Sequence, residues 1–85
     1  MRTTIFPNPF TSSINIELQT LKQDIATIVI YTVEGKKVLE TTQQLQYGEN
    51  KISIKNTENM SEGLYLLTIK GSNSVTIQKH ILKTN

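Results

Sequence analysis

The chain contains no cysteine and a single histidine among its 85 residues. Without cysteine it can build neither a disulfide framework nor a thiolate metal site. A zinc site takes about three or four protein ligands, and His80 has no second imidazole or thiolate with which to share an ion. We therefore expect no metal and no other cofactor, and we interpret His80 as an exposed residue of a strand.

Long apolar runs are also missing. The longest uninterrupted apolar stretches are residues 28–31 and 64–67, far short of the ~20 residues that cross a bilayer. Residues 1–7 hold no apolar segment of the ~7–15 residues that a secretory signal peptide needs. The sequence therefore predicts no transmembrane segment and no visible signal peptide.

Neither charge nor catalytic motifs are concentrated anywhere. The nine basic residues are scattered from Arg2 to Lys83, and no basic run exceeds the pair at residues 36–37. A nucleic-acid-binding domain gathers its basic residues into a stripe or patch, so we expect no nucleic-acid partner. The single aspartate, Asp24, gives no calcium-loop spacing, and no serine lies in a G-x-S-x-G motif. These absences argue against an enzyme.

What the sequence does contain is alternation of apolar and polar residues, which is typical of strands with one dry face. Turn signals separate these segments at intervals of about 8–12 residues. We predict an all-β fold, an Ig-like or Greek-key β-sandwich of about seven short antiparallel strands. The predicted strands are residues 3–6, 13–18, 25–33, 37–42, 51–55, 65–69 and 75–83.

The segments between these strands are interpreted as loops. Residues 18–25 have a weak helical spacing but are too short for a stable helix, so we predict a loop there. Residues 43–48 and 56–62 are predicted connections, residues 70–74 a turn, and residues 33–36 a tight turn in which Gly35 takes a positive φ. The strand at 25–33 is apolar on both faces, which predicts a position either in the middle of a sheet or under a covering loop.

Three segments carry more than a generic sandwich requires. In Phe-Pro-Asn-Pro-Phe, residues 6–10, two prolines stiffen the backbone and remove two donors, which predicts a crossover from one sheet to the other. Gly63-Leu64-Tyr65 resembles a tyrosine corner, in which the phenol bonds back to the preceding loop and the ring fills the core. In residues 78–83, alternation places Lys79 and Lys83 on the dry face with Ile81. Either a bulge resets the register there, or this is an edge strand whose lysines snorkel outward.

Taken in order, four segments resemble one family: the opening Phe-Pro-Asn-Pro, the apolar strand and turn at residues 28–38, Gly-x-Tyr with its strand at 63–69, and the lysine-flanked strand at 79–83. This is the type A C-terminal sorting domain of proteins exported by the type IX secretion system of Bacteroidota. Each motif is short, but the ordered set spans residues 6–83. Phe6 replaces the usual tyrosine, and Thr32 stands where the family often has aspartate, so a turn-capping role of that residue is open.

The resemblance implies a C-terminal secretion and sorting signal: one domain over residues 1–85, with a core at about 5–83, excised from a larger exported protein. Its partners would be type IX translocon and sortase components in the outer membrane and an N-terminal cargo protein. The route would run through the periplasm to the cell surface or the extracellular space, and a surface sortase would remove the domain, which itself catalyses nothing. The candidates for translocon recognition are Pro7, Asn8, Pro9, Gly35, Gly63, Tyr65, Lys79, His80, Ile81, Leu82 and Lys83.

Alternatives remain at this point. The final strand is expected to expose an edge to which a partner adds a strand, and a dimer through an edge strand is left open. The alternative function is a fibronectin-like or carbohydrate-binding accessory module, whose sugar-binding face would display coplanar aromatic rings. The five aromatic residues are Phe6, Phe10, Tyr31, Tyr47 and Tyr65.

Overall fold

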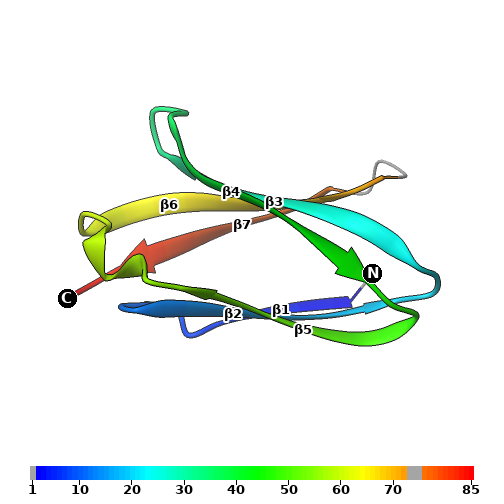
Figure 1. Ribbon diagram of the computed structural model, residues 1–85. Coiled ribbons are helices and arrows are strands. Elements are labelled where there is room, and N and C mark those ends of the chain that lie inside the picture. The colour runs from blue at the N-terminus through cyan, green and yellow to red at the C-terminus, as the bar shows by residue number, and fades with distance from the viewer. Residues whose placement is uncertain (1, 73–75) are drawn as a thin grey trace.

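The computed structural model describes residues 2–72 and 76–85, which form two facing antiparallel sheets (Figure 1). The three-stranded sheet has the order β1-β2-β5, with β1 at Arg2–Phe6, β2 at Ser13–Thr20 and β5 at Gly48–Lys55. The four-stranded sheet has the order β4-β3-β6-β7, with β3 at Asp24–Thr32, β4 at Lys37–Leu45, β6 at Gly63–Gly71 and β7 at Thr76–Lys83. A short 3₁₀ helix, η1 (Thr57–Asn59), leads from β5 to β6. The predicted all-β sandwich of seven antiparallel strands is confirmed.

The core lies between the two sheets and follows the alternation of the sequence. Each fully buried strand residue faces the opposite sheet, and burying one such side chain contributes about 1.5–3 kcal/mol. The large hydrophobic side chains that are fully buried are Phe10, Ile14, Ile16, Leu18, Ile28, Ile30, Leu45, Leu67, Ile69 and Ile81. Strand β3, predicted to be central or covered by a loop, lies between β4 and β6, and its Val29 is buried as well.

Two predicted connections are wrong because buried residues extend the strands. The loop predicted at residues 18–25 shrinks to 21–23, since Leu18 and Thr20 continue the inward face of β2. The Thr20 hydroxyl oxygen lies 2.9 Å from the Lys22 carbonyl oxygen and 2.8 Å from the Gln46 carbonyl oxygen, and it can donate its hydrogen to either. Strand β4 runs to Leu45 rather than stopping at residue 42, because Leu45 is fully buried. The turn predicted at 70–74 begins later than expected, because β6 runs to Gly71; residues 73–74 of that turn and the strand start predicted at Val75 lie outside the described residues.

The two ends of the sandwich hold different parts of the chain. The β1–β2 connection, the β3–β4 turn, the β5–β6 connection and the end of β7 gather at the end where the C-terminus lies (Figure 1). The pairing agrees with this arrangement, because Lys83 lies opposite Gly63 and next to Phe10, and Tyr65 lies opposite Thr32. We call this the C-terminal end of the sandwich. Strand β1 starts from the opposite end.

Candidate functional site

The segment between β1 and β2 lies along the outer edge of β7. The Asn8 side chain bridges two backbone groups of that strand: its Oδ1 accepts from the Leu82 N–H at 2.9 Å, and its Nδ2 donates to the His80 carbonyl at 3.2 Å. The next hydrogen bonds come from the backbone itself. The Phe10 N–H donates to the Leu82 carbonyl at 2.8 Å, and the Thr84 N–H donates to the Phe10 carbonyl at 2.9 Å. The chain therefore occupies the edge of β7 from residue 80 to 84 with its own segment.

This arrangement corrects two predictions. The proline segment does not cross between sheets, because β1 and β2 are neighbours in the same sheet. It makes an excursion to β7 and returns, held there by the fully buried Phe10 ring. Pro7, Asn8 and Pro9 remain exposed, and both prolines follow cis peptide bonds. The final strand does not offer a free edge along residues 80–84, because Asn8 and Phe10 already bond to it.

Tyr65 builds the predicted tyrosine corner. Its hydroxyl donates to the Ser61 carbonyl at 2.6 Å, and its ring is buried in the core. The ring meets Phe10 edge to face, with centroids 6.4 Å apart and planes at 61°. Gly63, two residues earlier, starts β6 with a φ of 143°, which favours glycine. Tyr65 and Gly63 thus fix the loop before β6 against the segment that covers β7.

The turn before β4 is capped by Thr32. The Thr32 hydroxyl accepts from the Lys36 N–H at 3.1 Å, while the Thr32 N–H donates to the Lys36 carbonyl at 2.8 Å. Gly35 has a φ of 93°, as predicted, and its N–H donates to the Thr32 carbonyl at 2.9 Å. The Thr32 hydroxyl therefore caps this turn, as the carboxylate of the more usual aspartate would.

The lysines of β7 follow different courses. The ladder between β6 and β7 pairs eight consecutive residues without a shift, so no bulge resets the register. Lys79, Ile81 and Lys83 consequently share the face that points to the other sheet. Lys79 is exposed, as expected for a snorkelling residue on an edge strand. Lys83 is only 2% exposed, and its ammonium donates to the Thr84 carbonyl at 2.9 Å, so the outward course predicted for this side chain is wrong.

The outward face of the four-stranded sheet carries an apolar surface at the same end. A shallow depression of about 370 Å³ is lined by Tyr31, Thr32, Val33, Gly35, Leu66 and His80. Leu64 and Leu82, paired on β6 and β7, are 47% and 41% exposed. We call Val33, Leu64, Leu66, His80 and Leu82 the outer-face surface. His80 is exposed, as predicted.

The sequence prediction included His80 and Leu82 of this surface and missed Val33, Leu64 and Leu66. The second apolar face of the strand at 25–33 was noted but interpreted only as a sign of burial, and that of residues 64–69 was not noted. A central strand needs such residues only where its outer face is covered. In the described structure Leu64 and Val33 are exposed, with Val33 at 62%.

The remaining features offer little chemistry. A second depression of about 570 Å³, at the opposite end, is lined by Gln23, Leu45, Tyr47 and the glutamines at 43, 44 and 46. Among the described residues, no three His, Asp or Glu side chains come together in a way that could hold a metal ion. No helix in the same residues has the length and hydrophobicity of a membrane span.

The candidate residues thus come from four separate segments and meet at one end of the fold. Comparison with known proteins agrees with this picture. No curated protein matches the chain, but the family model described as "Secretion system C-terminal sorting domain" matches residues 4–83. The match covers nearly the whole of the 85-residue sequence, and the chain therefore belongs to the family of type IX secretion system C-terminal sorting domains.

Proposed function

We propose that this domain is the address label of a larger exported protein and that the type IX machinery reads the C-terminal end of the sandwich. Membership of the family implies export to the cell surface or the extracellular space and attachment to an N-terminal cargo. The observation that carries the proposal is the junction of residues 7–10 with residues 80–84. Through Asn8 and Phe10, motifs from the two ends of the sequence become one surface.

The position of the N-terminal strand supports this proposal. Strand β1 starts at the end of the sandwich opposite to the outer-face surface (Figure 1). A cargo joined before β1 would therefore emerge away from the surface to be read. The address stays accessible after the cargo has folded.

Recognition by side chains fits the geometry better than strand addition at the end of β7. A partner strand would have to displace Phe10, whose side chain is fully buried. Removing a buried phenylalanine from a core costs about 3–5 kcal/mol, a large part of the stability of a small domain. The exposed Leu64, His80 and Leu82 can be contacted without such a cost.

Two further steps belong to the same proposal. A surface sortase removes the domain after passage through the periplasm, and the domain is the substrate of that enzyme rather than a catalyst. The shallow, apolar character of the depression beside His80 agrees with a binding surface more than with an active site.

The accessory-module alternative gains no support from the aromatic residues. Phe10 and Tyr65 belong to the core. Tyr47, the most exposed ring at 73%, lies beyond the end of β4, at the end of the sandwich opposite to Tyr31. Phe6 lies on β1 of the three-stranded sheet and Tyr31 on β3 of the other sheet. The five rings therefore do not form a coplanar platform of the kind that binds polysaccharides.

Export of a reporter tests the proposal. The chain is fused behind a signal peptide and a fluorescent protein in a type IX-competent bacterium, and surface or medium fluorescence is compared with periplasmic fluorescence. Truncating residues 81–85 is a poor test, because Ile81 and Lys83 are buried and their loss damages the fold. The sharper variant is Leu64→Glu with Leu82→Glu, since both side chains are exposed.

Ile25→Glu is the matched control. Ile25 is 57% exposed and lies on the same face of the same sheet, at the other end of β3. We expect the double variant to stay folded and to retain its reporter in the periplasm, while Ile25→Glu is exported normally. Equal export of both folded variants would contradict recognition through the outer-face surface. Periplasmic retention of the unmodified chain would contradict the address function itself.

A further inference from the structure

The four edge strands of the two sheets differ in how they are protected against pairing with another chain. Natural edges are blunted by short length, proline, lysine or a covering segment. The end of β7 is covered by Asn8 and Phe10, and β1 has only five residues before Pro7. Strand β5 carries exposed charges, among them Lys51 and Lys55. Each of these three edges has a recognisable guard.

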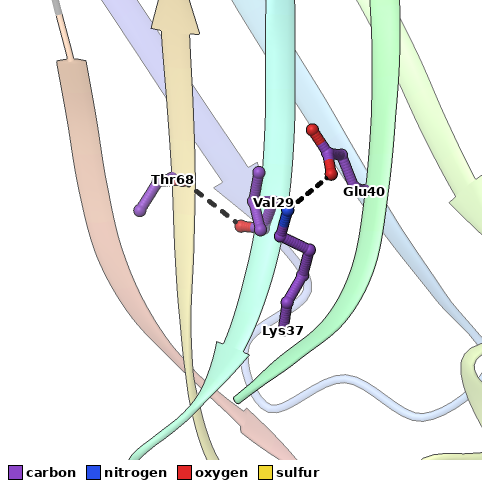
Figure 2. A network of polar contacts seen from close by, with 4 residues as sticks. All are labelled: Val29, Lys37, Glu40 and Thr68. Atoms are coloured by element: carbon purple, nitrogen blue, oxygen red, sulfur yellow. Dashed lines mark hydrogen bonds and ion pairs between the residues drawn. The ribbon is translucent and has the colours of Figure 1, made fainter. Parts of the chain in front are cut away.

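Strand β4 is the least guarded of the four edges: a register shift leaves Val38 without a partner on β3, but residues 39–45 pair without a shift. It is nine residues long, contains no proline and pairs on one side only, with β3. Figure 2 shows β4 beside β3, with Lys37 and Glu40 joined by an ion pair of 2.7 Å. These are the only charged residues of the strand, and they cancel each other. Within the described residues, no hydrogen bond from outside the sheet reaches the backbone of residues 37–45. The nearest such bond on the N-terminal side is in the preceding turn, where the Lys36 carbonyl accepts from the Thr32 N–H.

The exposed part of this edge is complementary to itself. Residues 41–44 read Thr-Thr-Gln-Gln, and all four side chains are exposed. Hydroxyl and carboxamide groups both donate and accept hydrogen bonds, so each can pair with the same group of an identical chain. Charged groups cannot do this, because like charges directly opposite one another are destabilising.

We propose that β4 pairs antiparallel with β4 of a second copy of this chain, about a two-fold axis at Thr42. This register places Thr42 opposite its own counterpart, Glu40 opposite Gln44, Thr41 opposite Gln43, and Leu39 opposite Leu45. Leu39 and Leu45 both face the core side of the sheet, so the apolar layer continues across the junction. The two four-stranded sheets become one continuous sheet of eight strands.

Neighbouring registers fit less well. A shift by one residue opposes side chains that point to different faces of the sheet. An axis at Thr41 sets Leu39 against Gln43, and an axis at Glu40 sets two carboxylates face to face. Within residues 39–45, only the axis at Thr42 matches apolar with apolar and polar with polar.

The pairing is weak and independent of the proposed address function. One strand edge buries less than the ~1,200 Å² of a standard interface, so we expect a Kd on the order of 0.1–1 mM. Sedimentation equilibrium of the purified chain, from about 20 μM to about 2 mM, covers that range. The expected mass rises from that of the 9.6 kDa monomer toward twice this value.

Charge substitutions on the axis identify the strand. Thr42→Lys and Thr42→Glu each place like charges opposite one another, and each should weaken association by about tenfold or more, equivalent to ~1.4 kcal/mol. An equimolar mixture of the two variants should associate again, because Lys then faces Glu. Ser53→Lys, on the exposed face of edge strand β5, is the matched control and should leave the Kd unchanged.

Three results would overturn the proposal: a chain that stays monomeric up to about 2 mM, variants at Thr42 that associate as well as the unmodified chain, or a dimer abolished by Ser53→Lys instead. None of these results bears on reporter export, which tests the address function separately.

Discussion

Replacing Tyr65 with phenylalanine isolates one hydrogen bond of the tyrosine corner. The substitution keeps the ring in the core and its contact with Phe10, and it removes only the hydroxyl that donates to the Ser61 carbonyl at 2.6 Å. A net intramolecular hydrogen bond contributes about 0.5–1.5 kcal/mol. Ser61 is exposed, so water can hydrate its carbonyl once the phenol is gone and no buried acceptor is left unsatisfied. We therefore expect a loss of about 1 kcal/mol rather than about 3 kcal/mol.

That loss is a substantial share of the stability of this domain. At 0.05–0.15 kcal/mol per residue, a chain of 85 residues has a free energy of unfolding of about 4–13 kcal/mol. For a domain of this size, 1 kcal/mol corresponds to about 4–8 °C in the melting temperature. Tyr65→Leu also removes the ring and should cost more, about 2–4 kcal/mol, by analogy with large-to-small core substitutions.

Urea unfolding followed by far-ultraviolet circular dichroism measures both changes. The midpoint should fall in the order unmodified chain, Tyr65→Phe, Tyr65→Leu, with equal slopes, because the surface exposed on unfolding hardly changes. Stability of Tyr65→Phe within about 0.3 kcal/mol of the unmodified chain would show that the hydroxyl contributes nothing, contrary to the usual net value of such a bond. Equal losses for the two variants would show that the hydroxyl, and not the ring, carries the corner.

The remaining predictions concern the cover of β7 and the start of β3. Asn8→Ala removes two hydrogen bonds at an exposed site and should lower the free energy of unfolding by about 1–2 kcal/mol. Hydrogen exchange should speed up at the Leu82 amide, which donates to the Asn8 side chain, and less at the Thr84 amide, which donates to the Phe10 carbonyl. Hydrogen bonds from the Ser72 hydroxyl, and then from the Ile25 amide, hold the pKa of Asp24 below its usual value of 3.8. A lowered folded pKa adds stability above about pH 4 that is lost as the pH falls through that pKa. Asp24→Asn should therefore flatten the loss of stability between about pH 5 and pH 2, as acid titrations of the melting temperature would detect.

The fold was predictable because its strands have a regular dry face. Ile14, Ile16 and Leu18 alternate with polar residues, and that period alone identifies β2 and its orientation. The ends of the strands were less predictable, since a polar residue such as Thr20 can be buried when two carbonyls are within reach of its hydroxyl. Such partners are distant in sequence, and local pattern does not reveal them.

The candidate site was predictable only in part for a similar reason. The motifs at residues 7–9 and 79–83 could be identified from the sequence, but not their contact, which depends on the amide of Asn8 reaching a strand more than 70 residues away. The prediction of a free final edge was wrong because Phe10, which anchors the covering segment, has no alternating neighbours that mark it as core. Lys83 was placed on the correct face, but the Thr84 carbonyl that receives its ammonium could not be foreseen.

The residues that carry the family resemblance divide into two groups. Asn8, Gly35, Gly63 and Tyr65 are accounted for by the fold, because each supplies a hydrogen bond or a positive φ that builds the C-terminal end of the sandwich. The presence of these four residues therefore does not show whether they contact a partner or only stabilise the fold.

His80 and Leu82 are different. Their side chains are exposed on the outward face of β7, and within the described residues neither belongs to the core nor makes a side-chain hydrogen bond. Substituting either residue removes less packing than substituting Ile81 or Tyr65, so it should lower the stability of the fold less. A variant at His80 or Leu82 that unfolds at the same urea concentration as the unmodified chain and yet stays in the periplasm would therefore separate recognition from folding.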